Sequence, residues 1–158
     1  MAKIIERYII LNEVMVIKQV SLESVIPIRH QILRANKPIS ECYYAEDKYS
    51  NTIHFGKFLD DQLVGIISIY AQDQNLEPSQ KEWRIRGMAV LKEYQGQGYG
   101  LDLVNLVIEY LRQQNAEMLW CNARTSACPF YEKTGFAKHG EEFDISGIGA
   151  HFIMIKNL

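Results

Sequence analysis

The spacing of hydrophobic residues along this chain changes repeatedly between a pattern typical of strands and a pattern typical of helices. Apolar residues that alternate with polar ones, or short runs rich in β-branched and aromatic residues, predict strands, whereas an apolar repeat of about 3.6 residues predicts a helix. Strands are predicted at residues 14–20, 52–58, 63–71, 82–91, 118–123, 136–143 and 151–156. Residues 22–34 are predicted to be a short turn and then a helix that ends near Arg34, and helices are predicted from 101 to the closing residues 113–115 and at 126–134.

Residues that favour helix ends and loops lie between these segments. Ser21 can cap the first helix, and Pro27 suits the first turn of a helix. Gly135 follows the third helix, where a glycine can adopt a positive φ. Residues 35–51 and 72–80 lack a sustained period and are predicted to be loops, the first of them long enough to suggest a functional role.

The order of the elements, β-α-β-β-β-α-β-α-β-β, predicts an α/β fold on a mixed sheet. The runs 52–58 and 63–71 are separated by only four residues, so we expect an antiparallel hairpin. Strand 118–123 is reached from strand 82–91 through a helix, a crossover long enough to make the two strands parallel.

Composition narrows the class of protein. The length of 158 residues predicts a single domain, residues 14–158, after an N-terminal extension of residues 1–13. The net charge of −2 does not favour nucleic-acid binding, and the apolar runs near the N-terminus are too short for a membrane span. An odd number of cysteines without a C-x-x-C pair predicts neither disulfides nor a metal site, and favours the cytoplasm: Cys42, Cys121 and Cys128.

The segment 95–100, Gln-Gly-Gln-Gly-Tyr-Gly, lies between a predicted strand and a predicted helix. Backbone N–H groups and the positive end of the helix dipole converge there, which favours an anion such as a phosphate. A Walker loop would need Lys and Ser or Thr after Gly100, where this chain has Leu101 and Asp102. A dinucleotide fingerprint that began at Gly96 would need Gly or Ala at position 101, so nucleotide binding is disfavoured.

The glycine segment resembles the R/Q-x-x-G-x-G/A signature of the GNAT N-acetyltransferase superfamily and lies, as there, between a strand and a helix. Residues 127–136 resemble the family's A-x-x-F/L-Y-E-K-x-G-F segment, and 149–154 resembles an H-x-x-M ending. The resemblance covers about residues 14–156. It implies a mixed, mostly antiparallel sheet with a splayed central pair of parallel strands, flanked by helices. It also implies acetyl transfer from acetyl-CoA directly to a primary amine of a small molecule or peptide.

The resemblance further implies which residues form the cofactor site. Main-chain groups near Met88 or Val90 would bind the pantetheine arm and polarise the thioester, and Tyr131 would protonate the departing thiolate as general acid. Many members have Asn where this chain has Arg124, so Asn122 is expected to supply the amide contact. The implied acetyl-CoA-binding residues are Met88, Ala89, Val90, Gln95, Gly96, Gln97, Gly98, Tyr99, Gly100, Asn122, Arg124 and Tyr131.

The sequence constrains the catalytic base and the acceptor amine less than it constrains the cofactor site. An amine with a pKa near 10 is almost wholly protonated at pH 7, so a base or a water chain is needed. Glu82 is the predicted base, with alternatives that spacing does not separate: His54, Glu46, Asp47 and His151. Aromatic residues could wall an acceptor pocket: Tyr43, Tyr44 and Trp83. The sequence does not decide whether the protein forms a homodimer. The competing hypothesis for its function is a non-catalytic acyl-CoA-binding sensor with the same fold.

Overall fold

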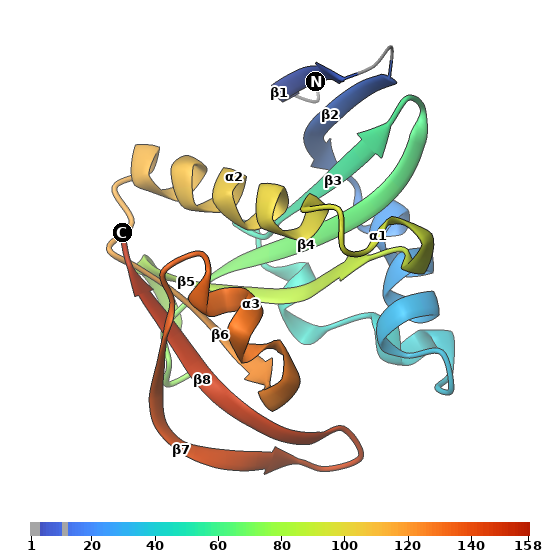
Figure 1. Ribbon diagram of the computed structural model, residues 1–158. Coiled ribbons are helices and arrows are strands. Elements are labelled where there is room, and N and C mark those ends of the chain that lie inside the picture. Colours follow the sequence, from blue (N-terminus) through green and yellow to red (C-terminus); the bar gives the residue numbers. More distant parts are fainter. Residues whose placement is uncertain (1–3, 11–12) are drawn as a thin grey trace. The chain divides into compact units, whose positions relative to one another are not determined.

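The computed structural model describes residues 4–10 and 13–158, with side chains from Val14 onward. Figure 1 shows the course of the chain through its helices and strands. The chain divides into two compact units, which we describe in turn. The first unit holds the residues up to Tyr70 and Gly87–Val104, and the second holds Ala71–Arg86 and Asn105–Leu158.

Antiparallel strands form the sheet of the first unit, in the order β1-β2-β3-β4. They are β1 (Ile4–Ile10), β2 (Glu13–Val20), β3 (Ile53–Leu59) and β4 (Gln62–Gln72). The predicted strand at 14–20 and the predicted hairpin at 52–71 are confirmed. Strand β1 was not predicted, and it lies inside the segment assigned as an N-terminal extension.

Helix α1 (Leu22–Ile28) begins at the predicted cap, where Ser24 N donates to Ser21 Oγ at 3.3 Å. The prediction that Pro27 lies in the first turn is wrong, because the cap starts the helix five residues earlier and Pro27 is inside it. The chain continues as a π-helix, η1 (Arg29–Leu33). Proline has no amide hydrogen, so Pro27 cannot donate a helical hydrogen bond, and this loss agrees with the widened turn that follows it.

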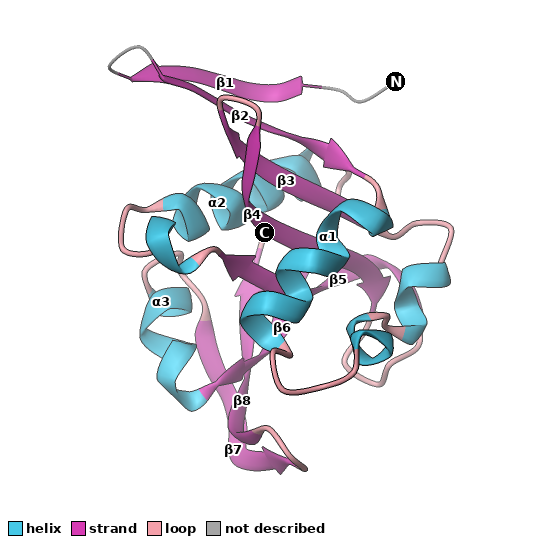
Figure 2. Ribbon diagram, turned by 90° about the vertical axis from the view of Figure 1, so that its right-hand side faces the viewer, coloured by secondary structure: helices cyan, strands magenta, loops and turns pink. Residues whose placement is uncertain are grey.

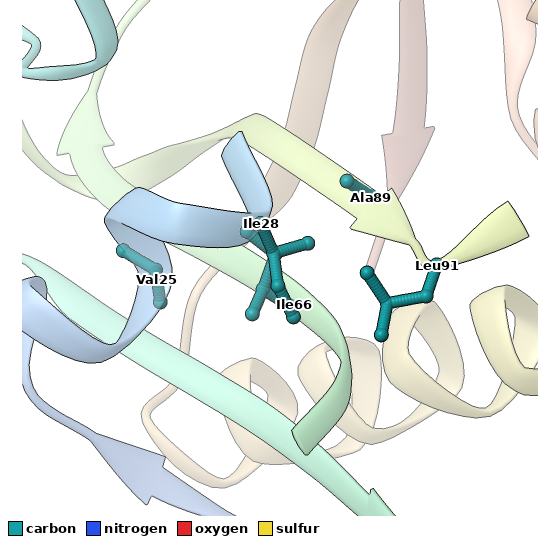
Figure 3. Packing of buried hydrophobic residues seen from close by; sticks show 5 residues of the cluster. All are labelled: Val25, Ile28, Ile66, Ala89 and Leu91. Atoms are coloured by element: carbon teal, nitrogen blue, oxygen red, sulfur yellow. The ribbon is translucent and has the colours of Figure 1, made fainter. Parts of the chain in front are cut away.

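Residues 35–51 form the predicted long connection and contain two 3₁₀ turns, η2 (Ile39–Cys42) and η3 (Ala45–Lys48). Helix α1 packs on the strands of its own unit, as Figure 2 shows. A cluster of buried apolar side chains joins α1, β4 and the end of β5 (Pro78–Val90), as Figure 3 shows: Val25, Ile28, Ile66, Ala89 and Leu91. Burying a side chain of this size stabilises the fold by about 1.5–3 kcal/mol.

In the second unit the strand order is β5-β6-β8-β7. Strand β6 (Met118–Arg124) runs parallel to β5, as predicted, from the pair Glu82–Met118 to the pair Ile85–Cys121. Strands β7 (Ala137–Ile145) and β8 (Gly149–Asn157) are antiparallel to their neighbours. The sheet is therefore mixed and mostly antiparallel with one parallel pair among its described strands, which confirms the predicted fold class.

Two helices follow the strands of the parallel pair. Helix α2 (Tyr99–Gln113) begins two residues before the predicted start and buries most of the predicted stripe, including Val104, Val107 and Leu111. The predicted helix at 126–134 is a 3₁₀ turn, η5 (Thr125–Ala127), followed by α3 (Cys128–Glu132). Gly135 has the predicted positive φ, 86°. No helix within residues 4–10 and 13–158 is long and apolar enough to span a membrane.

Candidate active site

The glycine loop, residues 95–100, joins the 3₁₀ turn η4 (Lys92–Tyr94) to α2. Gly96 has a φ of 77° and Gly98 a φ of 85°, a left-handed conformation that favours glycine. The first hydrogen bond of α2 runs from Asp102 N to Gly98 O at 3.0 Å, so the amides of the first turn precede the helical ladder. A Cβ at either glycine would meet no described atom within 4 Å, so the space beside the loop is open.

Two glutamine side chains hold this loop in shape. Gln95 Nε2 donates to Val90 O at 2.9 Å, and Gln97 Nε2 donates to a carbonyl of η4 at 3.3 Å. Tyr99 is buried, and its ring stacks on Tyr94 with the centroids 6.3 Å apart. These contacts hold the loop through its side chains, beside two glycines that have no side chain of their own.

Gly87 interrupts the extended backbone of strand β5, because its φ is 71°. A Cβ there would lie 3.0 Å from Arg29 Nε, so a side chain at this position would be both strained and crowded. Beyond this point Ala89 is buried in the core, whereas Met88 and Val90 are half-buried. The two half-buried residues belong to the short stretch of main chain that was predicted to bind a pantetheine arm.

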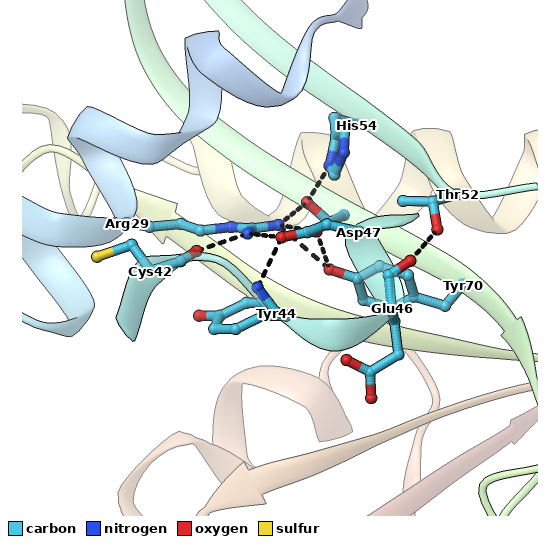
Figure 4. Close-up of polar contacts among 9 residues, drawn as sticks. Arg29, Cys42, Tyr44, Glu46, Asp47, Thr52, His54 and Tyr70 are labelled. Atoms are coloured by element: carbon cyan, nitrogen blue, oxygen red, sulfur yellow. Dashed lines mark hydrogen bonds and ion pairs between the residues drawn. The ribbon is translucent and has the colours of Figure 1, made fainter. Parts of the chain in front are cut away.

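Arg29 is fully buried and forms the centre of a polar network, shown in Figure 4. Its Nη1 and Nη2 make a bidentate salt bridge to the two oxygens of Asp47, at 2.7 and 3.0 Å. Nη1 also donates to Cys42 O at 2.8 Å, and Nη2 donates to Ser68 Oγ at 2.9 Å and Tyr70 Oη at 3.2 Å. One cation thus connects η1, the connection 35–51 and strand β4.

Asp47 receives further hydrogen bonds, from Tyr44 N and from Tyr70 Oη, each at 2.8 Å. Burial alone would raise the pKa of the Asp47 carboxyl, but the hydrogen bonds from Arg29 and from Tyr44 N lower that pKa overall. A carboxylate that is ionised and already so well solvated by the protein is a poor proton acceptor. The network therefore disfavours Asp47 as the base, and the carboxylate of the neighbouring Glu46 points away from it in Figure 4.

His54 joins the network through Nδ1, which lies 2.7 Å from Ser68 Oγ. Ser68 Oγ already accepts a hydrogen bond from Arg29, and an arginine cannot accept one in return. The Ser68 hydroxyl thus connects the His54 ring to the Arg29 guanidinium. Burial and the positive charge of Arg29 both lower the pKa of His54, so the ring is neutral near pH 7.

A pH dependence of stability follows from this lowered pKa. The unfolded chain protonates His54 near pH 6.5, its ordinary value, whereas the folded protein resists protonation. The free energy of unfolding should therefore fall as the pH drops below about 6.5 towards the folded pKa. We expect urea unfolding of His54→Asn to show a weaker loss over this range, while the matched variant of the exposed His139 behaves as wild type. Equal pH profiles for His54→Asn and wild type would contradict this assignment.

In the second unit, Tyr131 on α3 is buried and its hydroxyl is hydrogen-bonded with the side chain of Cys121 on β6. Burial raises the pKa of the Cys121 thiol to about 12. Burial, together with Cys121, raises the pKa of Tyr131 well above its usual value of 10. Both groups stay protonated at neutral pH, so Tyr131 can donate a hydrogen bond but gives up its proton reluctantly.

The other predicted residues lie on β5, β6 and β8 and in the connection 35–51. Glu82 is half-buried on β5 and Asn122 is half-buried on β6, whereas Arg124 is exposed at the end of β6. His151 is buried, and its Nδ1 donates to Gly149 O at 2.6 Å. Two of the three aromatic residues proposed for an acceptor wall, Tyr44 and Trp83, are buried, and the third, Tyr43, is exposed.

Within the described ranges, no group of three or more His, Cys, Asp or Glu side chains could hold a metal ion.

The model of the "Acetyltransferase (GNAT) family" matches residues 22–136, which include both the glycine loop and Tyr131. This chain belongs to the GNAT family. The matched range also covers the Arg29 network, whereas β1, β2, β7 and β8 lie outside it.

Proteins named as acetyltransferases resemble the chain over nearly its whole length. The "uncharacterized N-acetyltransferase YitI" of Bacillus subtilis (strain 168) is 39% identical over 90% of this chain and 95% of its own. An aminoglycoside 6′-N-acetyltransferase complexed with coenzyme A superposes with a TM-score of 0.72 and 14% identity, covering 89% and 96% of the two chains. The IAA acetyltransferase from Bacillus cereus ATCC 14579 has a TM-score of 0.69 and 17% identity, covering 91% and 99%.

Several residues around these groups of the GNAT domain were not predicted. Arg29 follows the apolar run of α1, which was a weak sign that it lies on the buried side. Ser68 and Tyr70 are two residues apart on β4 and so face the same way, but sequence spacing does not reveal that a cation lies between them. The hydrogen bond between Cys121 and Tyr131 was likewise not predicted.

Proposed function

We propose that this GNAT protein is an acetyl-CoA-dependent N-acetyltransferase that transfers the acetyl group directly to a primary amine of a small molecule or peptide. The observation that carries the proposal is the glycine loop, with Gly96 and Gly98 in left-handed conformations before the first turn of α2. Family membership supports acyl transfer. The neighbour that was solved with coenzyme A supports use of an acyl-CoA by this fold.

The diphosphate of CoA would be bound by backbone amides of the loop and of the first turn of α2. Gln95, Gln97, Tyr99 and Gly100 contribute through backbone position, since the two glutamine side chains hold the loop. Met88–Val90 would offer main-chain groups to the pantetheine arm, and a main-chain N–H there would stabilise the oxyanion. Asn122 and Arg124 remain further proposed contacts.

The proposed reaction is attack of a neutral amine on the thioester carbonyl, followed by breakage of the C–S bond and release of CoA as thiol. Glu82, as the proposed base, would accept the proton of the incoming ammonium. Because the pKa of Tyr131 is raised and an ordinary thiol has a pKa near 8.5, full proton transfer from Tyr131 to the thiolate is uphill. We therefore propose that Tyr131 stabilises the leaving thiolate by a hydrogen bond, and that the second amine proton finally neutralises it.

This role predicts the effect of Tyr131→Phe. A hydrogen bond to a charged group contributes about 1.5–3 kcal/mol, so kcat should fall by roughly 10- to 100-fold. The Kd for acetyl-CoA should stay within about twofold, because the bond strengthens only as the thiolate forms. Tyr49→Phe, at a more exposed tyrosine, serves as the matched control. Unchanged kcat in Tyr131→Phe would remove Tyr131 from the chemistry.

Incubating the purified protein with acetyl-CoA and a panel of primary amines, and following free thiol and acetylated product together, tests the reaction itself. Equal amounts of the two products with at least one amine would support transfer. Tight CoA binding without product from any amine would instead favour the competing hypothesis of an acyl-CoA sensor.

We also propose that residues 14–158 act as one acyltransferase domain in the cytoplasm, as a monomer or homodimer and without a nucleic-acid partner. The three cysteines are free and buried, which supports a reducing compartment: Cys42, Cys121 and Cys128.

A further inference from the structure

Lys57 and Asp102 form an ion pair beside the glycine loop. Lys57 belongs to β3 and is only 2% exposed, and its ammonium pairs with the Asp102 carboxylate in the first turn of α2. Lys57 Nζ also lies 4.5 Å from the centroid of the Tyr99 ring, at the first residue of that helix. The buried amine therefore contacts two side chains of the turn that begins at the loop.

The two charges of this pair act differently when they are unpaired: the ammonium of Lys57 is unfavourable for the fold, and the carboxylate of Asp102 is unfavourable for anion binding. A buried ammonium is costly unless it is paired, and the N-terminus of a helix carries a partial positive charge of its own. The carboxylate of Asp102 is 51% exposed and lies one turn from Gly98, where it would repel an incoming diphosphate. Paired, the two charges cancel, and the amides of the first turn keep the potential that favours an anion.

We propose that Lys57 is a positioning residue for acyl-CoA: it neutralises Asp102 and anchors the first turn of α2, so that the glycine loop can bind the diphosphate. The inference rests on the proposed function and adds to it a residue that lies far from the loop in sequence. Lys57 therefore affects binding of the diphosphate ester of the ligand. It does not affect binding of the pantetheine end.

A double-mutant cycle separates this role from simple packing. The variants are Lys57→Met, Asp102→Asn and the double variant, and calorimetry at low salt gives their Kd values for CoA, pantetheine and inorganic pyrophosphate. Lys57→Met should weaken CoA and pyrophosphate about tenfold, because Asp102 becomes an unpaired negative charge near the loop. The double variant should return to within about threefold of wild type. Pantetheine, which lacks the diphosphate, should bind all four proteins alike.

Asp102→Asn decides the question if Lys57→Met does not fold. The substitution is at an exposed side chain, is nearly isosteric and removes a negative charge. The variant should therefore bind CoA at least as tightly as wild type. Weaker CoA binding by Asp102→Asn, or a folded double variant as weak as Lys57→Met, would overturn the inference while leaving CoA binding by wild type intact. Absence of CoA binding by wild type would instead overturn the proposed function, and the inference with it.

Discussion

Replacement of Arg29 by methionine is expected to lower the free energy of unfolding by about 3–5 kcal/mol, as for removal of one partner of a buried ion pair. The change leaves the Asp47 carboxylate, whose side chain is 2% exposed, without its cation. It also removes donors from Cys42 O, Ser68 Oγ and Tyr70 Oη. Methionine fills a similar volume, so the loss should come from the uncompensated charge and the broken hydrogen bonds.

Urea unfolding of the variant and of wild type measures this loss. Arg34→Met is the matched control, because Arg34 is partly exposed and donates to the carbonyl of its own neighbour, Leu33 O. Changes of that kind usually stay within about 0.5 kcal/mol. If Arg29→Met and Arg34→Met had similar effects, the Arg29 network would not be the anchor of the connection 35–51.

Gly98→Glu is expected to weaken CoA binding by more than about 100-fold. Gly98 has a φ of 85°, where a side chain is strained, and its Cβ would point into the open space in front of the loop. A glutamate there would place a negative charge where the proposed diphosphate binds, and it would also disturb the N-cap of α2. Equilibrium binding of CoA to the folded variant measures the effect.

Gly147→Glu controls for backbone strain in this experiment. Gly147, in the turn before β8, has a φ of 74°, and a Cβ there also meets no described atom within 4 Å. The two variants share the same chemical change and a similar conformational cost, so only Gly98→Glu should lose CoA binding. Loss of binding in both variants, or in neither, would contradict the loop assignment.

The glycine loop was predictable from sequence because its chemistry is local. The spacing of Gly96 and Gly98 before an apolar helix predicts a loop that leads into a helix, which the structure shows, and an anion site, which stays a prediction. The parallel pairing of β5 and β6 was predictable for a similar reason, since the length of the crossover determines its direction.

The Arg29 network was not predictable because its members are distant in sequence. Arg29 and Tyr70 are separated by 41 positions, and only the fold brings them together. The environment of Tyr131 is a similar case: the motif marked the residue, but the burial and the neighbouring Cys121 that raise its pKa come from the fold. The position of Pro27 was predicted wrongly for the opposite reason. The local preference of proline for the first turn of a helix was followed, but the cap at Ser21 starts the helix earlier.

Calorimetric titration of the wild-type protein with CoA, pantetheine, ATP and NAD tests the central claim, that the glycine loop binds the diphosphate of an acyl-CoA. We predict that CoA binds and that pantetheine, ATP and NAD all bind much more weakly, because CoA alone joins the diphosphate to a pantetheine arm. Absence of CoA binding, or binding of ATP or NAD as tight as that of CoA, would contradict the account.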